Sequence, residues 1–198
     1  MTAWPHFRRE APALVALAIP FAASAACGRP LPEAAREAAW AGLGLYAVLV
    51  VLPLVDPLRR IRWDRKPLPG LRLAAAVAAS ATALLMARAL FDGEPEAARR
   101  IGALAVVAFL AVVGNALPAL PPNLFIGIRV PWTLRDRRVW AQTHRVAGHG
   151  LVALTLGLVA LWPVFDGAAY EAVSITALAL GAVAILIYSW TLSRSPSV

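Results

Sequence analysis

The sequence predicts an all-α fold, a polytopic membrane bundle of about six transmembrane helices, and two observations carry this prediction. First, 60% of the 198 residues are hydrophobic and 15% are charged, with a mean hydropathy of +0.68. A soluble domain of this length cannot bury so much apolar surface. Second, the apolar residues fall in runs of about 20, the length at which a helix crosses the hydrocarbon core. We expect residues 1–198 to form a single integral membrane domain.

Six apolar runs are separated by short polar segments. They lie at about 11–27, 38–55, 71–91, 101–120, 146–165 and 170–192. All are rich in Ala, Leu, Val and Gly, and the small residues let helix backbones approach closely. No β-barrel alternation is present, so helices are the remaining way to satisfy the backbone in lipid. The first run ends near Cys27 and loosely resembles a signal sequence. We expect it to remain as the first helix, whereas its cleavage would leave five spans.

The basic residues are distributed unevenly between alternate loops. One side combines both termini with the segments after the second and fourth runs, and it carries Arg8, Arg9, Arg59, Arg60, Arg62, Arg65, Lys66, Arg72, Arg129, Arg135, Arg137, Arg138, Arg145 and Arg194. The opposite loops carry Arg29, Arg36, Arg99 and Arg100, together with most of the acidic residues. The positive-inside rule therefore predicts that both termini and the basic loops are cytoplasmic, with the chain in the inner or plasma membrane.

The net charge of +8 follows from these loops. We expect the loops to meet anionic lipid head groups and not to bind nucleic acid directly. Two polar residues lie within the apolar runs. Arg88 is near the outer end of the third run and should snorkel to the interface, with a functional intramembrane charge as the alternative. Asn115 is deep in the fourth run, where its amide needs a partner on a neighbouring helix or faces a polar cavity.

The least lipid-like segment is about 114–150, which holds more Trp, Pro, Gly and Arg than a connector needs. The prolines at 121–122 predict the end of the fourth helix. Thr133 and Asp136 fit a weak capping box. A short interfacial helix is therefore predicted at about 134–145, between helices 4 and 5.

Aromatic and imidazole side chains mark this segment. Trp140 and His144 are four residues apart and should share a helix face. Trp132 and Trp140 suit the head-group layer, so a plain membrane anchor is an alternative to a functional site. His144 and His149 are five apart and do not share a face, so we expect no metal site and no cofactor. No nucleophile motif, phosphate loop or carboxylate pair occurs, and we do not expect an enzyme.

The same segment resembles the SdpI family of bacterial integral membrane proteins. The matching positions are Gly114, Asn115, Pro122, Asn123, Gly127, Ile128, Arg129, Pro131, Trp132, Thr133, Leu134, Val139, Trp140, Thr143, His144, Arg145 and Gly148. A second matching motif, Pro53, Asp56 and Pro57, follows the second run. The resemblance covers about 53–150. One departure is Val130, where the family usually has Thr.

The resemblance implies an immunity-type protein that gives resistance to a secreted antimicrobial peptide toxin and signals to a cytoplasmic regulator. The surface presented to a partner would then be formed or braced by Arg129, Trp132, Trp140, His144 and Arg145. A small transporter or permease is an alternative, favoured by the six helices and opposed by the lack of an acidic residue mid-span. A membrane enzyme that holds a phosphate through its arginines is a further alternative.

Overall fold

The described part of the chain, residues 4–55 and 68–195 of a computed structural model, is helical and contains no strand. The elements are α1 (Trp4–Cys27), α2 (Glu33–Val55), α3 (Leu68–Phe91), α4 (Pro95–Ala116), η1 (Leu117–Ala119), α5 (Pro131–Arg135), α6 (Arg137–Leu161) and α7 (Gly167–Arg194). Six of them, α1 to α4 with α6 and α7, are long and apolar enough to cross a membrane. The predicted all-α fold with six candidate spans is therefore confirmed.

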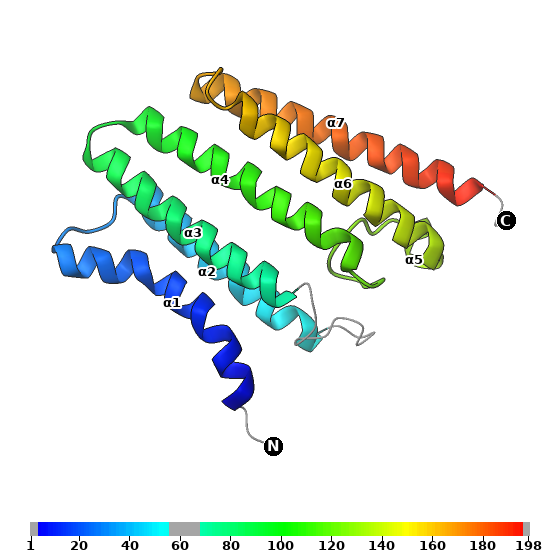
Figure 1. The fold of residues 1–198 in the computed structure, drawn as a ribbon, viewed down its shortest axis with the longest axis horizontal. Coiled ribbons are helices and arrows are strands. Elements are labelled where there is room, and N and C mark those ends of the chain that lie inside the picture. The colour runs from blue at the N-terminus through cyan, green and yellow to red at the C-terminus, as the bar shows by residue number, and fades with distance from the viewer. Residues whose placement is uncertain (1–3, 56–67, 196–198) are drawn as a thin grey trace.

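Successive long helices run in opposite directions (Figure 1). The described starts of α1 and α3 and the end of α7 lie toward the end of the bundle that holds α5. The α1–α2, α3–α4 and α6–α7 connections lie at the other end. We refer to these as the α5 end and the opposite end. The arginines between α4 and α6 are at the α5 end, which the charge pattern predicts to be cytoplasmic.

The helices pack mainly around α3 in the N-terminal part and around α6 in the C-terminal part. α1, α2 and α4 all pack on α3, α4 packs on α6, and α6 packs on α7. Apolar clusters fill these contacts, one of which joins Leu49 of α2 with Leu71 and Ala75 of α3. Phe125 and Ile126 of the α4–α6 connection pack against the same cluster. The two parts of the bundle, α1–α3 and α4–α7, therefore meet through α3, α4 and this connection.

The helices after the α4–α6 connection have other bounds than the sequence predicted. The expected helix at 134–145 does not form as a separate element, because α5 ends at Arg135 and α6 continues from Arg137 to Leu161. Asp136 is the N-cap of α6, where its Oδ1 accepts hydrogen bonds from the backbone N–H groups of Arg138 (2.7 Å) and Val139 (3.4 Å). No proline occurs in α6, so nothing interrupts the helix once it is capped.

Arg72 also differs from the prediction, which placed it in a basic loop. It lies in the second turn of α3 and is 1% exposed. Its Nη2 donates to Glu10 Oε1 of α1 at 2.7 Å, and the Tyr46 hydroxyl of α2 donates to Glu10 Oε2 at 3.0 Å. Glu10 and Tyr46 are buried as well. A buried ion pair with a hydroxyl partner thus joins the three N-terminal helices.

The opposite end of the bundle is held by polar side chains of α4. Glu96 Oε1 accepts from the backbone N–H of Gly167 at the start of α7, at 2.7 Å. Arg100 Nη2 donates to the Trp162 carbonyl at 2.9 Å, and its guanidinium lies 4.8 Å from the centroid of the Trp162 ring system. Arg88 lies near the end of α3 with a largely exposed side chain, and its Nε is 3.3 Å from Asp92 Oδ2. Its snorkelling stays a prediction.

Candidate functional site

Asn123 organises the turn that follows α4 and η1. Its Nδ2 donates to the carbonyls of Pro121 (2.8 Å) and Ile126 (3.1 Å). Its Oδ1 accepts from the backbone N–H groups of Phe125 (2.9 Å) and Ile126 (2.7 Å). The side chain is 0% exposed. All donors and acceptors of the amide are used, so Asn123 shapes the connection and offers nothing to a ligand.

Gly127 brings the connection against His144 of α6. Its φ of +109° lies in a region that side chains disfavour, and a Cβ at this position would collide with His144 Nε2. The close approach lets the Ile128 N–H donate to His144 Nε2 at 3.1 Å. His144 Nδ1 lies 2.9 Å from the Trp140 carbonyl. These partners assign the proton to Nδ1, with Nε2 as the acceptor.

Trp140 closes the same site from the preceding turn of α6. Its indole is 1% exposed, and its Nε1 donates to the Leu120 carbonyl at 2.9 Å. Its ring stacks on the His144 imidazole, with centroids 3.9 Å apart and planes at 19°. The predicted shared face of Trp140 and His144 is confirmed. The connection folds over the ring and buries it, and the expected head-group position of Trp140 stays a prediction.

Thr133 and Trp132 fix α5 onto its surroundings. Thr133 Oγ1 accepts from the Val130 N–H at 3.2 Å and donates to the Ile128 carbonyl at 2.7 Å. Thr133 therefore caps α5 from its third position, with Pro131 at the first. The predicted capping box of Thr133 and Asp136 does not form, because Asp136 is itself the N-cap of α6. Trp132 Nε1 donates to Ser189 Oγ of α7 at 3.0 Å. Ser189 is 0% exposed, and sequence spacing gave no signal for its role.

The crossing of α4 and α6 depends on two glycines. A Cβ added to Gly148 would lie 2.5 Å from the Gly114 carbonyl oxygen, and one added to Gly114 would lie 3.0 Å from the Gly148 oxygen. The helix backbones therefore touch directly, as small residues allow in membrane bundles. This contact sets the distance between α4 and α6. The α4–α6 connection joins the two helices at this distance.

The remaining motif residues divide by exposure. Arg129 and Arg145 are exposed, and Arg129 Nη1 donates to the Leu124 carbonyl at 2.5 Å. Thr143 is 0% exposed, and its hydroxyl has no hydrogen-bond partner among the described residues. Asn115 is exposed and makes no hydrogen bond within the described ranges 4–55 and 68–195. The expected partner on a neighbouring helix is therefore absent from the described residues, since Gly114 takes the face toward α6 and turns Asn115 outward. The alternative, a polar cavity at Asn115, stays a prediction.

The second motif is separate from this site. Pro53 lies in the last turns of α2, whereas Asp56 and Pro57 are outside the described residues. Within the described part of the chain, no group of three or more His, Cys, Asp or Glu side chains could hold a metal ion. His149 is exposed on α6, away from the buried His144.

Sequence reasoning missed the contact of Glu10, Tyr46 and Arg72, which lies outside the motif segment. One signal was available, because a glutamate and an arginine each stand at the start of an apolar run. Charges at such positions are costly unless they pair.

Comparison with known proteins bears on the motif segment directly. The profile of the SdpI/YfhL protein family matches residues 119–191, from the end of η1 into the last turns of α7. Over this segment, which is less than half of the chain, the protein is similar to the SdpI/YfhL family. The SdpI/YfhL match contains Asn123, Gly127, Trp140 and His144 with their partners, and it also includes Ser189. It does not reach Pro53 or the rest of the expected region before residue 119.

One curated SdpI relative is the immunity protein SdpI of Bacillus subtilis (strain 168). It is 38% identical over 64 residues, which are 32% of this chain and 30% of the relative. The chain thus matches less than a third of that protein's length. No solved structure matches the chain. Six candidate spans, together with this partial similarity to the SdpI/YfhL family, support a multi-pass membrane protein.

Proposed function

We propose that this SdpI-type protein protects the cell that carries it against a secreted, membrane-active antimicrobial peptide. The observation that carries the proposal is the overlap between two findings. The segment that matches the SdpI/YfhL family, which shares its name with an immunity protein similar to part of this chain, contains the linked contacts of Asn123, Gly127, Trp140 and His144. Because buried hydrogen bonds and ring stacking hold this segment in place, it is suited to act as a rigid support for a recognition surface.

Buried and exposed motif residues have different parts in this proposal. Asn123, Trp140 and His144 have their polar atoms occupied inside the protein, so they position the backbone. Arg129 and Arg145 are exposed beside them and can reach a partner, although Arg129 Nη1 also donates to the Leu124 carbonyl. Exposed charges on a rigid support give orientation and selectivity in recognition.

The basic α5 end suggests a second partner. Arg135 and Arg137 are exposed near Arg129 and Arg145 in the chain, and we place this end in the cytoplasm on the positive-inside pattern. A cytoplasmic regulator with an acidic surface would complement it. Ligand binding elsewhere would alter the regulator's affinity only if the ligand favours one of two conformations.

A protection assay tests the main proposal. A sensitive bacterial host expresses the parent, Arg129→Ala, Arg145→Ala or the control His149→Ala, each at equal membrane levels, and is challenged with secreted membrane-active peptides. His149 is exposed on the same helix as Arg145 and lies outside the motif. We expect the parent and the control to raise the inhibitory peptide concentration. In each arginine variant the increase in inhibitory concentration should be about tenfold smaller, which corresponds to the loss of one charged contact of about 1.4 kcal/mol.

The assay has a clear contrary outcome. If the parent gives no protection against any peptide of a broad panel, the immunity proposal fails although the similarity to the SdpI/YfhL family stands. If the parent protects and both arginine variants protect equally well, the exposed arginines are not the recognition surface.

A further inference from the structure

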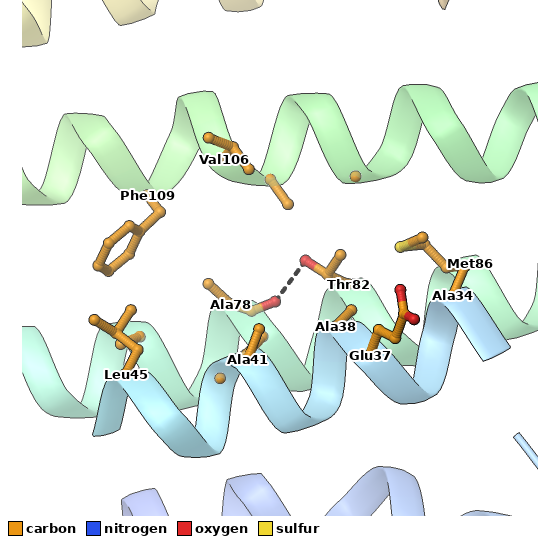
Figure 2. Close-up of a pocket in the computed structure, with 15 residues that line it drawn as sticks. Ala34, Glu37, Ala38, Ala41, Leu45, Ala78, Thr82, Met86, Val106 and Phe109 are labelled. Carbon is orange, nitrogen blue, oxygen red and sulfur yellow. Dashed lines mark hydrogen bonds between the residues drawn. The ribbon is translucent and has the colours of Figure 1, made fainter. Parts of the chain in front are cut away.

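A groove lies between α2 and α4, outside the motif segment. Both helices pack on α3 but make no extensive contact with each other in the described ranges. The resulting groove has a volume of about 520 Å³, with α3 as its floor (Figure 2). It runs from Ala34 and Glu37 near the opposite end of the bundle to Leu45 and Phe109 (Figure 2). Ala34 and Leu45 are eleven residues apart on α2, which is about 16 Å or three helical turns.

Small side chains form most of the groove wall. Nine of its 15 lining residues are Ala or Gly, and they come from all three helices. Thr82 is polar, but its hydroxyl donates to the Ala78 carbonyl at 2.7 Å, as Figure 2 shows. Walls of this kind let another helix bring its backbone close, which is how helices associate in lipid.

Glu37 gives one end of the groove a negative charge. It is exposed in the second turn of α2, it lines the groove, and it forms no hydrogen bond or ion pair within residues 4–55 and 68–195. Figure 2 shows its carboxylate beside Met86 at that end. A carboxylate at the end of an apolar groove in a membrane span favours a cationic partner.

We propose that this groove receives an apolar helical segment of a membrane-inserted peptide, with a basic residue near the outer end of that segment paired to Glu37. The proposal rests on the proposed function in taking a peptide as the ligand. The wall of small residues suits a helix backbone, and the carboxylate suits Lys or Arg. A phospholipid is less suitable, because its phosphate would approach the Glu37 carboxylate.

Binding to a defined probe tests the groove. The full-length protein in phosphatidylcholine nanodiscs is titrated with a synthetic helix of about 20 Leu and Ala residues that carries one Lys near its outer end and a dansyl group. Energy transfer from the tryptophans reports binding. A second probe has Gln in place of Lys. The variants are Glu37→Gln, Ala41→Phe, which fills the groove, and Ala47→Phe, an exposed control on α2 outside the groove.

We expect Ala41→Phe to weaken binding of the Lys probe by about tenfold or more and Ala47→Phe to leave it unchanged. Glu37→Gln should weaken the Lys probe by about threefold to tenfold and leave the Gln probe unchanged. Equal effects of the two Phe variants would overturn the proposal. So would loss of a copurified phospholipid in Ala41→Phe with unchanged peptide affinity, which would assign the groove to lipid.

The protection assay separates this proposal from the proposed function. Protection by the parent that is lost in Ala41→Phe and retained in Ala47→Phe supports both. Protection that both variants retain overturns the groove proposal and leaves immunity standing. Probe binding with the expected variant pattern, but no protection by the parent, supports the groove and refutes immunity.

Discussion

His144 joins three parts of the site through one side chain. Its imidazole accepts from the Ile128 N–H, donates to the Trp140 carbonyl and stacks on the Trp140 ring. The lack of a Cβ at Gly127 allows this approach, because a Cβ there would collide with the ring. A buried backbone N–H that loses its acceptor costs about 1–3 kcal/mol, so the Ile128 contact makes this histidine structurally important.

The substitution His144→Ala tests this residue-scale account. It removes the acceptor of the Ile128 N–H and the stacking partner of Trp140, so we expect a loss of about 2–4 kcal/mol in the free energy of unfolding. His149→Ala, on the exposed side of the same helix, should stay within about 0.5 kcal/mol. Thermal unfolding of both variants in detergent, followed by circular dichroism, measures the difference. Equal melting temperatures would contradict the assignment.

At the scale of elements, α4 and α6 contact each other directly through their backbones. Gly114 and Gly148 face each other where the two helices cross. Pro118 also lies against Gly148, because a Cβ there would be 2.8 Å from its Cδ. The connection between α4 and α6 can fold onto Trp140 only while the helices stay this close.

Alanine substitutions at two glycines of α6 should therefore change the stability of the protein in opposite directions. Gly148→Ala places a methyl group against the Gly114 carbonyl and should destabilise the protein by about 1–3 kcal/mol. At Gly150 an added Cβ has nothing within 4 Å, so Gly150→Ala should gain up to about 1 kcal/mol from helix propensity. Melting temperatures of the two variants, compared with that of the parent, show whether each substitution stabilises or destabilises the protein. A gain at Gly148 would show that the close crossing is not required.

At the scale of the whole molecule, the N-terminal helices depend on a contact outside the family match. Glu10 of α1 is linked to Arg72 of α3 and to Tyr46 of α2. Breaking a buried ion pair by removal of one partner leaves an uncompensated charge and costs about 3–5 kcal/mol. Loss of the hydroxyl alone costs about 1 kcal/mol.

Glu10→Gln should therefore destabilise the protein far more than Tyr46→Phe. We expect proteolysis in detergent to cut the α1–α2 connection, at residues 28–32, faster in Glu10→Gln, because α1 packs mainly on α3 and loses its buried partner there. Cleavage rates followed by mass spectrometry measure the effect. Equal rates in the two variants would show that the ion pair does not hold α1.

Much of the architecture could be predicted from the sequence, because it depends on composition along the chain. Apolar runs long enough to span lipid become helices whatever their neighbours, since no other structure satisfies the backbone there. The shared face of Trp140 and His144 followed from helical periodicity alone. The family resemblance was visible for the same reason, since its Trp, Pro, Asn and His residues are close in sequence.

The tertiary structure decided what each polar residue contacts. Asn115 faces outward, Trp140 is buried, and Arg72 pairs with Glu10 across 62 residues of chain. The α2–α4 groove also exists only because both helices pack on α3. Such contacts depend on which helix faces meet and at what distance, and the periodicity of a single segment does not contain that information. The sequence by itself determined the six spans and the motif segment, and only the packing of the helices decided which motif residues are buried in the fold and which are exposed.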